Sequence, residues 1–280
     1  MKVKEVMTHD PIVARVPGTR REVLKTLVKS KKTGLPVLDA DDKLVGIITR
    51  RDFFNHPKEE QLALIMQMNP PIISQNDTIE NAAKIIIEHH IIYHIPVLDS
   101  KKQLVGVIAP SDLLSIIEER KITSPVGEFI SRTCVPVYQE TPVSVCANIF
   151  EITKVYALPV LDESSKLKGL ITDRDVFNLS FVDEKMALSQ LGLGNDEDSW
   201  TWEGLRNVVR LYYQETKIDL PKIPVKEVMI KDPLSVFDKT PVSDAAREMR
   251  KQDFGQLPVR DLEDRLIALI YDFDIVSALI

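Results

Sequence analysis

The chain has 280 residues, 44% hydrophobic and 28% charged, a balance that excludes an intrinsically disordered protein and predicts two or more compact units. The formal net charge of -6 offers no overall attraction for a nucleic acid backbone. Two cysteines, Cys134 and Cys146, cannot build a disulfide framework or a four-cysteine metal site, and we expect two buried thiols. Because no apolar run approaches the roughly 20 residues that cross a bilayer, the sequence predicts a cytoplasmic protein without membrane contact.

The first predicted elements are an extended piece, "PIVARVP" at 11–17, and a helix, "TRREVLKTLVKSK" at 19–31. Thr19 followed by Glu22 fits a capping box at the start of this helix. Two apolar runs, "LPVLD" and "LVGIIT", then flank the polar turn "ADDK" and predict a hairpin with a short helix after it. The helix carries an apolar stripe that should face a core: Val23, Leu24, Leu27 and Val28.

The hairpin pattern occurs four times along the chain. The segments "GLPVLDADDKLVGIITRRD", "HIPVLDSKKQLVGVIAPSD", "ALPVLDESSKLKGLITDRD" and "QLPVRDLEDRLIALIYDFD" align without a gap. Their prolines are separated by 60, 63 and 99 residues, which locates one insertion between the third and fourth copies. Such regular self-similarity predicts four structural repeats.

The predicted fold class is α/β (α+β), each repeat being a small three-stranded sheet with two helices. A repeat of about 60 residues buries too little surface alone, so we expect repeats to pair through their sheets. The predicted modules are 1–120 and 121–280, built from repeats at 1–58, 62–120, 121–180 and 223–280 with a helical connector at 181–222. One helix face in the connector is apolar, and core packing or an aromatic docking patch would explain its tryptophans, Trp200 and Trp202.

These four segments resemble the CBS domain, and the layout is similar to that of stand-alone archaeal CBS proteins and the γ subunit of AMP-activated protein kinase. The resemblance covers the chain apart from the connector. It implies that the repeats pair as two Bateman modules, which stack as a disc. It also implies clefts between paired repeats that bind adenosine compounds.

The family's binding signature is a threonine or serine, two residues and an aspartate at the end of the last strand, which implies sites at Thr49 with Asp52 and at Thr172 with Asp175. An ionised carboxylate can accept hydrogen bonds from both hydroxyls of a ribose. Amides at the start of the following helix can face a phosphate. A Thr-x-x-Asp motif also fits a plain helix cap, and both interpretations can hold.

Three further residues occupy positions at which the family contacts a phosphate: Arg51, Arg174 and His94. A forked guanidinium suits this role, whereas a histidine that is only structural remains an alternative for His94.

The copies differ at the proposed binding positions. Repeat two has Ala109 in place of threonine but keeps Ser111 and Asp112, while repeat four keeps Asp274 behind two aromatic residues. We therefore predict that repeats one and three bind most tightly, repeat two more weakly and repeat four least.

No catalytic constellation is visible, so the sequence predicts a regulatory protein and not an enzyme. We expect it to bind AMP, ADP or ATP, to need no cofactor, and to transmit energy status to a partner protein. The alternatives are a sensor of S-adenosylmethionine or methylthioadenosine, a nucleic-acid-binding protein using "VKSKK" at 28–32, and a scaffold with empty clefts. Whether the chain is a monomer or a homodimer stays open.

Overall fold

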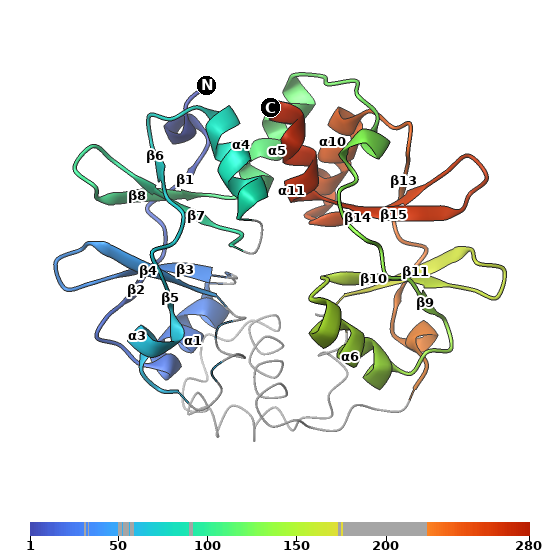
Figure 1. Cartoon of the computed structure of the whole chain (residues 1–280), viewed down its shortest axis with the longest axis horizontal. Helices are drawn as coiled ribbons and strands as arrows, with labels where there is room; N and C mark the ends of the chain where they lie inside the picture. The colour runs from blue at the N-terminus through green and yellow to red at the C-terminus, as the bar shows by residue number, and fades with distance from the viewer. Residues whose placement is uncertain are drawn as a thin grey trace. The chain divides into compact units, whose positions relative to one another are not determined.

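The computed structural model describes residues 1–30, 32, 34–49, 52, 56, 59–89, 92–172, 175 and 223–280 (Figure 1). The predicted connector lies outside these residues. The described chain forms two compact units, of which the first takes residues 1–112 and the second begins at residue 113. The division falls inside helix α5 (Pro110–Glu119). No helix among the described residues is long and apolar enough to cross a membrane.

The first unit contains two four-stranded sheets. One has the order β2 (Ala14–Arg15), β3 (Gly34–Leu38), β4 (Leu44–Thr49) and β5 (Gln67–Met68). The other has the order β1 (Thr8–His9), β8 (Leu104–Ile108), β7 (Ile95–Leu98) and β6 (Ile73–Ser74). The described residues add three α-helices that lie wholly in this unit, α1 (Arg20–Lys29), α3 (Leu62–Ile65) and α4 (Ile79–Glu88), together with a short 3-10 helix, Val3–Glu5.

The second unit repeats this plan. One sheet has the order β12 (Ile230–Lys231), β11 (Leu167–Thr172), β10 (Ala157–Leu161) and β9 (Val137–Tyr138). The other has only three strands: β13 (Val236–Phe237), β14 (Gln256–Arg260) and β15 (Leu266–Tyr271). Its α-helices are α6 (Val143–Thr153), α10 (Val242–Gln252) and α11 (Asp272–Ile275), and its 3-10 helices are Val126–Phe129, Val225–Glu227 and Val276–Leu279. Four small sheets with helices confirm the predicted α/β fold class.

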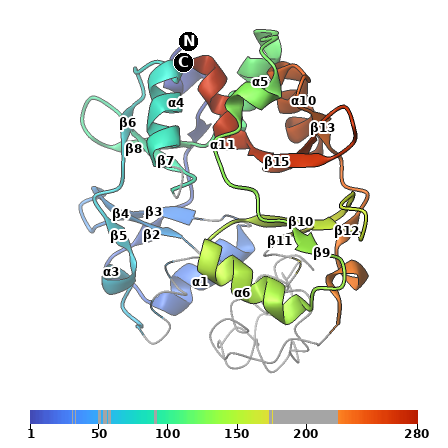
Figure 2. The same cartoon turned by 45° about the vertical axis from the view of Figure 1, so that its right-hand side comes forward.

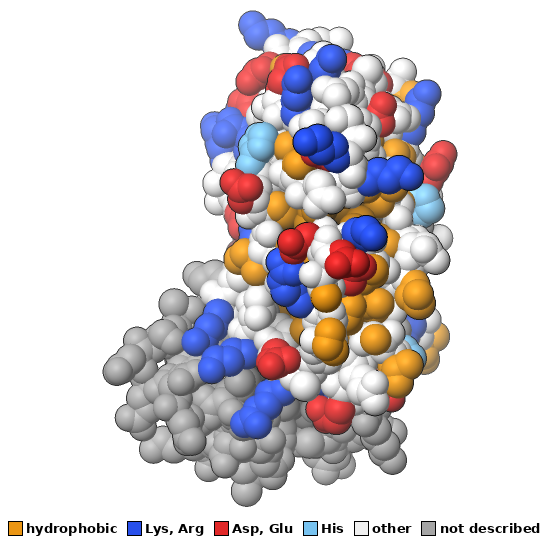
Figure 3. Space-filling view, turned by 90° about the vertical axis from the view of Figure 1, so that its left-hand side faces the viewer, with side chains coloured by type: hydrophobic (Ala, Val, Ile, Leu, Met, Phe, Trp, Pro, Cys, Tyr) orange, Lys and Arg blue, Asp and Glu red, His pale blue; other side chains and the backbone are white. Residues whose placement is uncertain are grey.

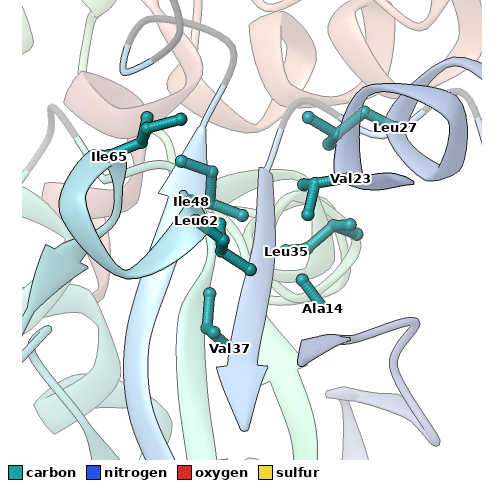
Figure 4. Packing of buried hydrophobic residues seen from close by; sticks show 8 residues of the cluster. All are labelled: Ala14, Val23, Leu27, Leu35, Val37, Ile48, Leu62 and Ile65. Carbon is teal, nitrogen blue, oxygen red and sulfur yellow. The ribbon is translucent and has the colours of Figure 1, made fainter. Parts of the chain in front are cut away.

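The buried stripe of α1 packs on the first sheet (Figure 4). Val23 and Leu27 lie against Leu35 of β3, while Leu62 of α3 covers Ile48 of β4. Val23 and Leu27 are therefore core residues, as predicted, and the side chains of Leu24 and Val28 lie outside the described part. In the second unit, Cys146 is buried in the equivalent core, whereas Cys134 is half-buried, and burial raises the pKa of both thiols to about 11.

Three short strands cross from one repeat into the sheet of its partner repeat, and we call β1, β5 and β12 the exchanged strands. β1 of repeat one pairs with β8 of repeat two (Figure 1), while β5 of repeat two pairs with β4 of repeat one and β12 of repeat four pairs with β11 of repeat three (Figure 2). The exchange adds a fourth strand that the sequence analysis did not predict. Paired repeats are thus joined by backbone hydrogen bonds as well as by side-chain packing.

A glycine in each receiving strand makes room for the exchanged strand. A Cβ atom added at Gly46 would lie 2.9 Å from Sδ of Met66, and at Gly106 2.6 Å from Sδ of Met7. The third such glycine, Gly169, faces Met229. Repeat four has Ala268 at this position, and its strand β15 has no exchanged partner among the described strands.

We expect Gly106→Ala to lower the free energy of unfolding by about 1–3 kcal/mol, the usual cost of overpacking. The new methyl group would lie 2.8 Å from the backbone oxygen of Thr8, so β1 must shift. Urea unfolding measures the effect. Gly255→Ala is the matched control, because its nearest neighbour is a carboxylate oxygen of Asp272 at 3.8 Å. Equal stability of the two variants would contradict the prediction.

Candidate functional site

The threonine and aspartate of the first predicted motif are hydrogen-bonded to each other at the end of β4. The backbone amide and hydroxyl of Thr49 both donate to Oδ2 of Asp52, at 2.7 and 2.6 Å. The other carboxylate oxygen, Oδ1, accepts from Nε2 of Gln67 at 2.7 Å. Asp52 is only 4% exposed, so these bonds satisfy a buried charge. Arg51, the predicted phosphate contact, lies outside the described residues.

The third repeat has the same motif in a more exposed setting. Thr172 donates to Oδ2 of Asp175 from its amide at 2.9 Å and from its hydroxyl at 2.6 Å. The amide of Asp175 donates back to the Thr172 hydroxyl at 3.3 Å, which completes a reciprocal cap. Asp175 is half-buried. Arg174 lies outside the part of the chain that the structure describes.

The second repeat lacks the threonine bond. Oδ2 of Asp112 accepts from the amide of Ala109 at 2.8 Å, and Ser111 is exposed. Burial raises the pKa of Asp112, an effect opposed by that amide and by the positive charge of Lys32. Burial also lowers the pKa of His94 to about 4, and Lys32 adds to that shift. His94 is therefore neutral at pH 7 and could offer a phosphate a hydrogen bond but no positive charge.

We expect His94 to make the protein less stable as the pH falls from 6.5 to about 4. In this window the unfolded chain binds more protons than the folded one, so acid favours unfolding by about 1–3 kcal/mol. Urea unfolding across the interval should show a smaller pH dependence for His94→Gln than for the unaltered chain. His9→Gln, at an exposed position, is the control. An unchanged pH dependence in His94→Gln would contradict this expectation.

The fourth repeat surrounds its aspartate with groups from repeat three. Oδ2 of Asp274 accepts from the amide of Tyr271 at 3.1 Å, and Oδ1 accepts from the hydroxyl of Ser131 at 2.5 Å. The guanidinium Nε of Arg132 lies 3.7 Å from the same oxygen. Asp274 is only 5% exposed, so its carboxylate is held inside the protein.

Two aromatic rings complete the surroundings of Asp274. The ring of Phe273 stacks on that of Tyr271, with centroids 5.0 Å apart, and the Arg132 guanidinium lies 4.6 Å from the Phe273 centroid. Burial raises the pKa of the Tyr271 hydroxyl, so this group stays protonated. Tyr271 and Phe273 are the two aromatic residues from which the sequence predicted the weakest binding in repeat four, but the sequence did not predict the two residues from repeat three.

Sequence reasoning missed three residues that contact the predicted aspartates: Gln67, Ser131 and Arg132. A signal for them exists, because Gln67 follows Met66, whose side chain lies against Gly46, and Ser131 and Arg132 follow Ile130 at the corresponding sequence position of repeat three. Aligning the segments before the repeats, and not only the hairpins, would have selected these positions. No group of three or more histidine, cysteine, aspartate or glutamate residues in the described ranges could hold a metal ion.

Comparison with known proteins assigns the repeats. The family model described as the CBS domain matches residues 3–59, 62–119, 126–181 and 225–280. A CBS domain-containing protein of Methanocaldococcus jannaschii is 38% identical over 125 residues, which cover 43% of this chain and 98% of that protein. A crystal structure from the same organism, described as a proposed archaeal homologue of γ-AMPK, matches all of both chains with a TM-score of 0.72 and 20% identity.

Some relatives are much longer. The L-aspartate semialdehyde sulfurtransferase of Methanocaldococcus jannaschii is 29% identical over 128 residues, which cover 45% of this chain and 25% of the enzyme. The chain thus spans about a quarter of the length of that relative.

Proposed function

Because this chain belongs to the CBS domain family, we propose that it is a regulatory protein that binds adenine nucleotides and reports their level to a partner protein. The observation that carries the proposal is the geometry at Asp175. Its Oδ2 atom is fixed by Thr172, which orients the carboxylate, and no described residue donates to Oδ1. An oriented carboxylate with one open oxygen suits the two hydroxyls of a ribose.

The remaining predicted residues form proposed binding sites of different strength. Asp52 provides a second ribose site, and Arg51 and Arg174 are proposed phosphate contacts. Asp112, with Ser111 and His94, forms a weaker site because His94 is neutral and Ala109 has no hydroxyl. Asp274 forms the weakest site, since Ser131 already occupies its carboxylate. The proposal includes no cofactor and no catalytic step.

The surface charge distribution favours a small ligand over a nucleic acid. Lysine and arginine side chains lie among aspartate and glutamate side chains on the described part of the face in Figure 3. A nucleic acid backbone binds to clustered positive charge, and binding falls as salt neutralises the contacts. A salt-sensitive complex with RNA or DNA would contradict the preference for a nucleotide.

A thermal-shift panel tests the proposed function. AMP, ADP, ATP, S-adenosylmethionine and methylthioadenosine are added separately to the purified chain, because a ligand that binds the folded state raises the unfolding temperature by mass action. We expect the nucleotides to raise it, and the rise to shrink in Asp175→Ala. A higher unfolding temperature with only S-adenosylmethionine or methylthioadenosine would show that the ligand is one of these compounds and not a nucleotide. No rise with any of the five would refute adenosine sensing.

A further inference from the structure

Two of the exchanged strands, β5 and β12, each place one residue near the predicted ribose-binding aspartate of the partner repeat. Gln67 pairs with Ile47 in β4, and Ile230 pairs with Leu170 in β11. Both pairs lie two positions before the threonine of the Thr-x-x-Asp motif. Directly paired residues share one face of a sheet, and side chains two positions apart share it too. Gln67 and Ile230 therefore occupy equivalent positions, each on the face that carries the threonine.

The two residues differ in what they offer the aspartate. The Gln67 amide donates to Oδ1 of Asp52 at 2.7 Å, whereas the side chain of Ile230 has no donor for Asp175. Ser131 follows Ile130 as Gln67 follows Met66, and its hydroxyl donates to Oδ1 of Asp274. The same carboxylate oxygen is thus occupied from the partner repeat at Asp52 and at Asp274.

The two carboxylates differ in the number of acceptor sites that they leave for a ribose. An ionised carboxylate has about four lone-pair sites, two on each oxygen. Thr49 fills two sites on Asp52 and Gln67 fills a third, which leaves one for a ribose that donates two hydrogen bonds. Thr172 fills two sites on Asp175, and among the described residues nothing occupies the remaining two.

We propose that the exchanged-strand residue sets the affinity of the sites in repeats one and three by competing, or failing to compete, with the ribose for the aspartate. Gln67 is an internal competitor at Asp52, whereas Ile230 offers no donor to Asp175. The proposal rests on the proposed function. It also gives a route for regulation, because a ribose that displaces the Gln67 amide breaks a bond to the exchanged strand β5. Ligand binding in repeat one then acts directly on repeat two.

A reciprocal exchange of the two side chains tests the proposal, with AMP as the probe in titration calorimetry. Gln67→Ile is made in an Asp175→Ala background, which removes the other predicted tight site, and Ile230→Gln is made in an Asp52→Ala background for the same reason. A hydrogen bond to a charged group changes affinity by about tenfold or more. We expect Gln67→Ile to tighten AMP binding by about tenfold and Ile230→Gln to weaken it by a similar factor.

Met68→Gln is the matched control. Met68 follows Gln67 in β5, is exposed, and points to the opposite face of the strand, so this change should leave AMP affinity as it was. Gln67→Ala, which also removes the amide, replaces Gln67→Ile if circular dichroism shows that the larger change unfolds the chain. AMP binding that is unchanged or weaker in Gln67→Ile and Gln67→Ala would overturn the competition. Absence of AMP binding in the unaltered chain would instead refute the proposed function, on which this inference depends.

Discussion

Asp274→Ala is expected to lower the free energy of unfolding by about 2–4 kcal/mol, because it removes the partner of the buried Tyr271 amide and of the buried Nε atom of Arg132. The carboxylate accepts from Ser131 and from the Tyr271 amide, and its side chain is 3% exposed beside the 33% exposed Arg132. Nε of Arg132 is itself buried and has no hydrogen-bond partner within 3.5 Å. Without Asp274 this part of the guanidinium would lose the carboxylate with which it forms an ion pair.

Asp175→Ala is the matched control for Asp274→Ala, since both residues lie in the second unit at equivalent motif positions. Asp175 is half-buried and caps one helix start through Thr172, so its loss should cost only about 1 kcal/mol. Urea unfolding of both variants measures the difference. If the two changes destabilise the chain equally, Asp274 is not held by repeat three in the way we describe.

These expectations differ although the sequence presents four equivalent aspartates. The hairpins, the proline-to-glycine interval and the stripe of Val23 and Leu27 are local patterns, and residues close in the sequence produce them. The fold class could therefore be predicted from the sequence. The Thr-x-x-Asp cap is also local, and the structure contains it at both Asp52 and Asp175.

The exchanged strands could not be predicted in the same way. Each is two residues long, too short for a periodic signal, and it pairs with a strand in a different repeat. The information is present only as a correlation between distant positions. In three sheets the glycine of the receiving strand lies against a methionine of the partner repeat. At the corresponding sequence positions, the fourth repeat has Ala268 in place of the glycine and the third repeat has Ile130 in place of the methionine. Burial is similarly non-local, which is why the neutral state of His94 does not follow from its neighbours in the chain.

The exchanged strands also explain the fourth repeat. A glycine permits the close approach of a strand, and Ala268 at this position has a Cβ atom that would interfere with it. The preceding segment of repeat three then makes no strand pair with β15 in the described structure. Its side chains Ser131 and Arg132 instead contact Asp274. One substitution in the repeat pattern thus accompanies the loss of the exchanged strand, while the segment still donates to the carboxylate, as Gln67 does at Asp52.

Titration with AMP is expected to show about two tight sites, one of which disappears in Asp52→Ala and the other in Asp175→Ala. Each change removes the acceptor for both ribose hydroxyls, and loss of even one bond to a charged group lowers affinity by about tenfold to a hundredfold. The site at Asp175 should bind AMP more tightly than the site at Asp52, because Ile230 does not compete for the Asp175 carboxylate.

Asp175→Asn is the conservative control, since it keeps the shape of the side chain and removes the charge that strengthens the hydrogen bonds. Tight binding that persists in the double variant and disappears in Asp274→Ala would show that repeat four, and not repeats one and three, holds the ligand. The hydrogen bond from Ser131 to Asp274 argues against that outcome, because a ligand there must first replace an interaction that the folded chain already makes.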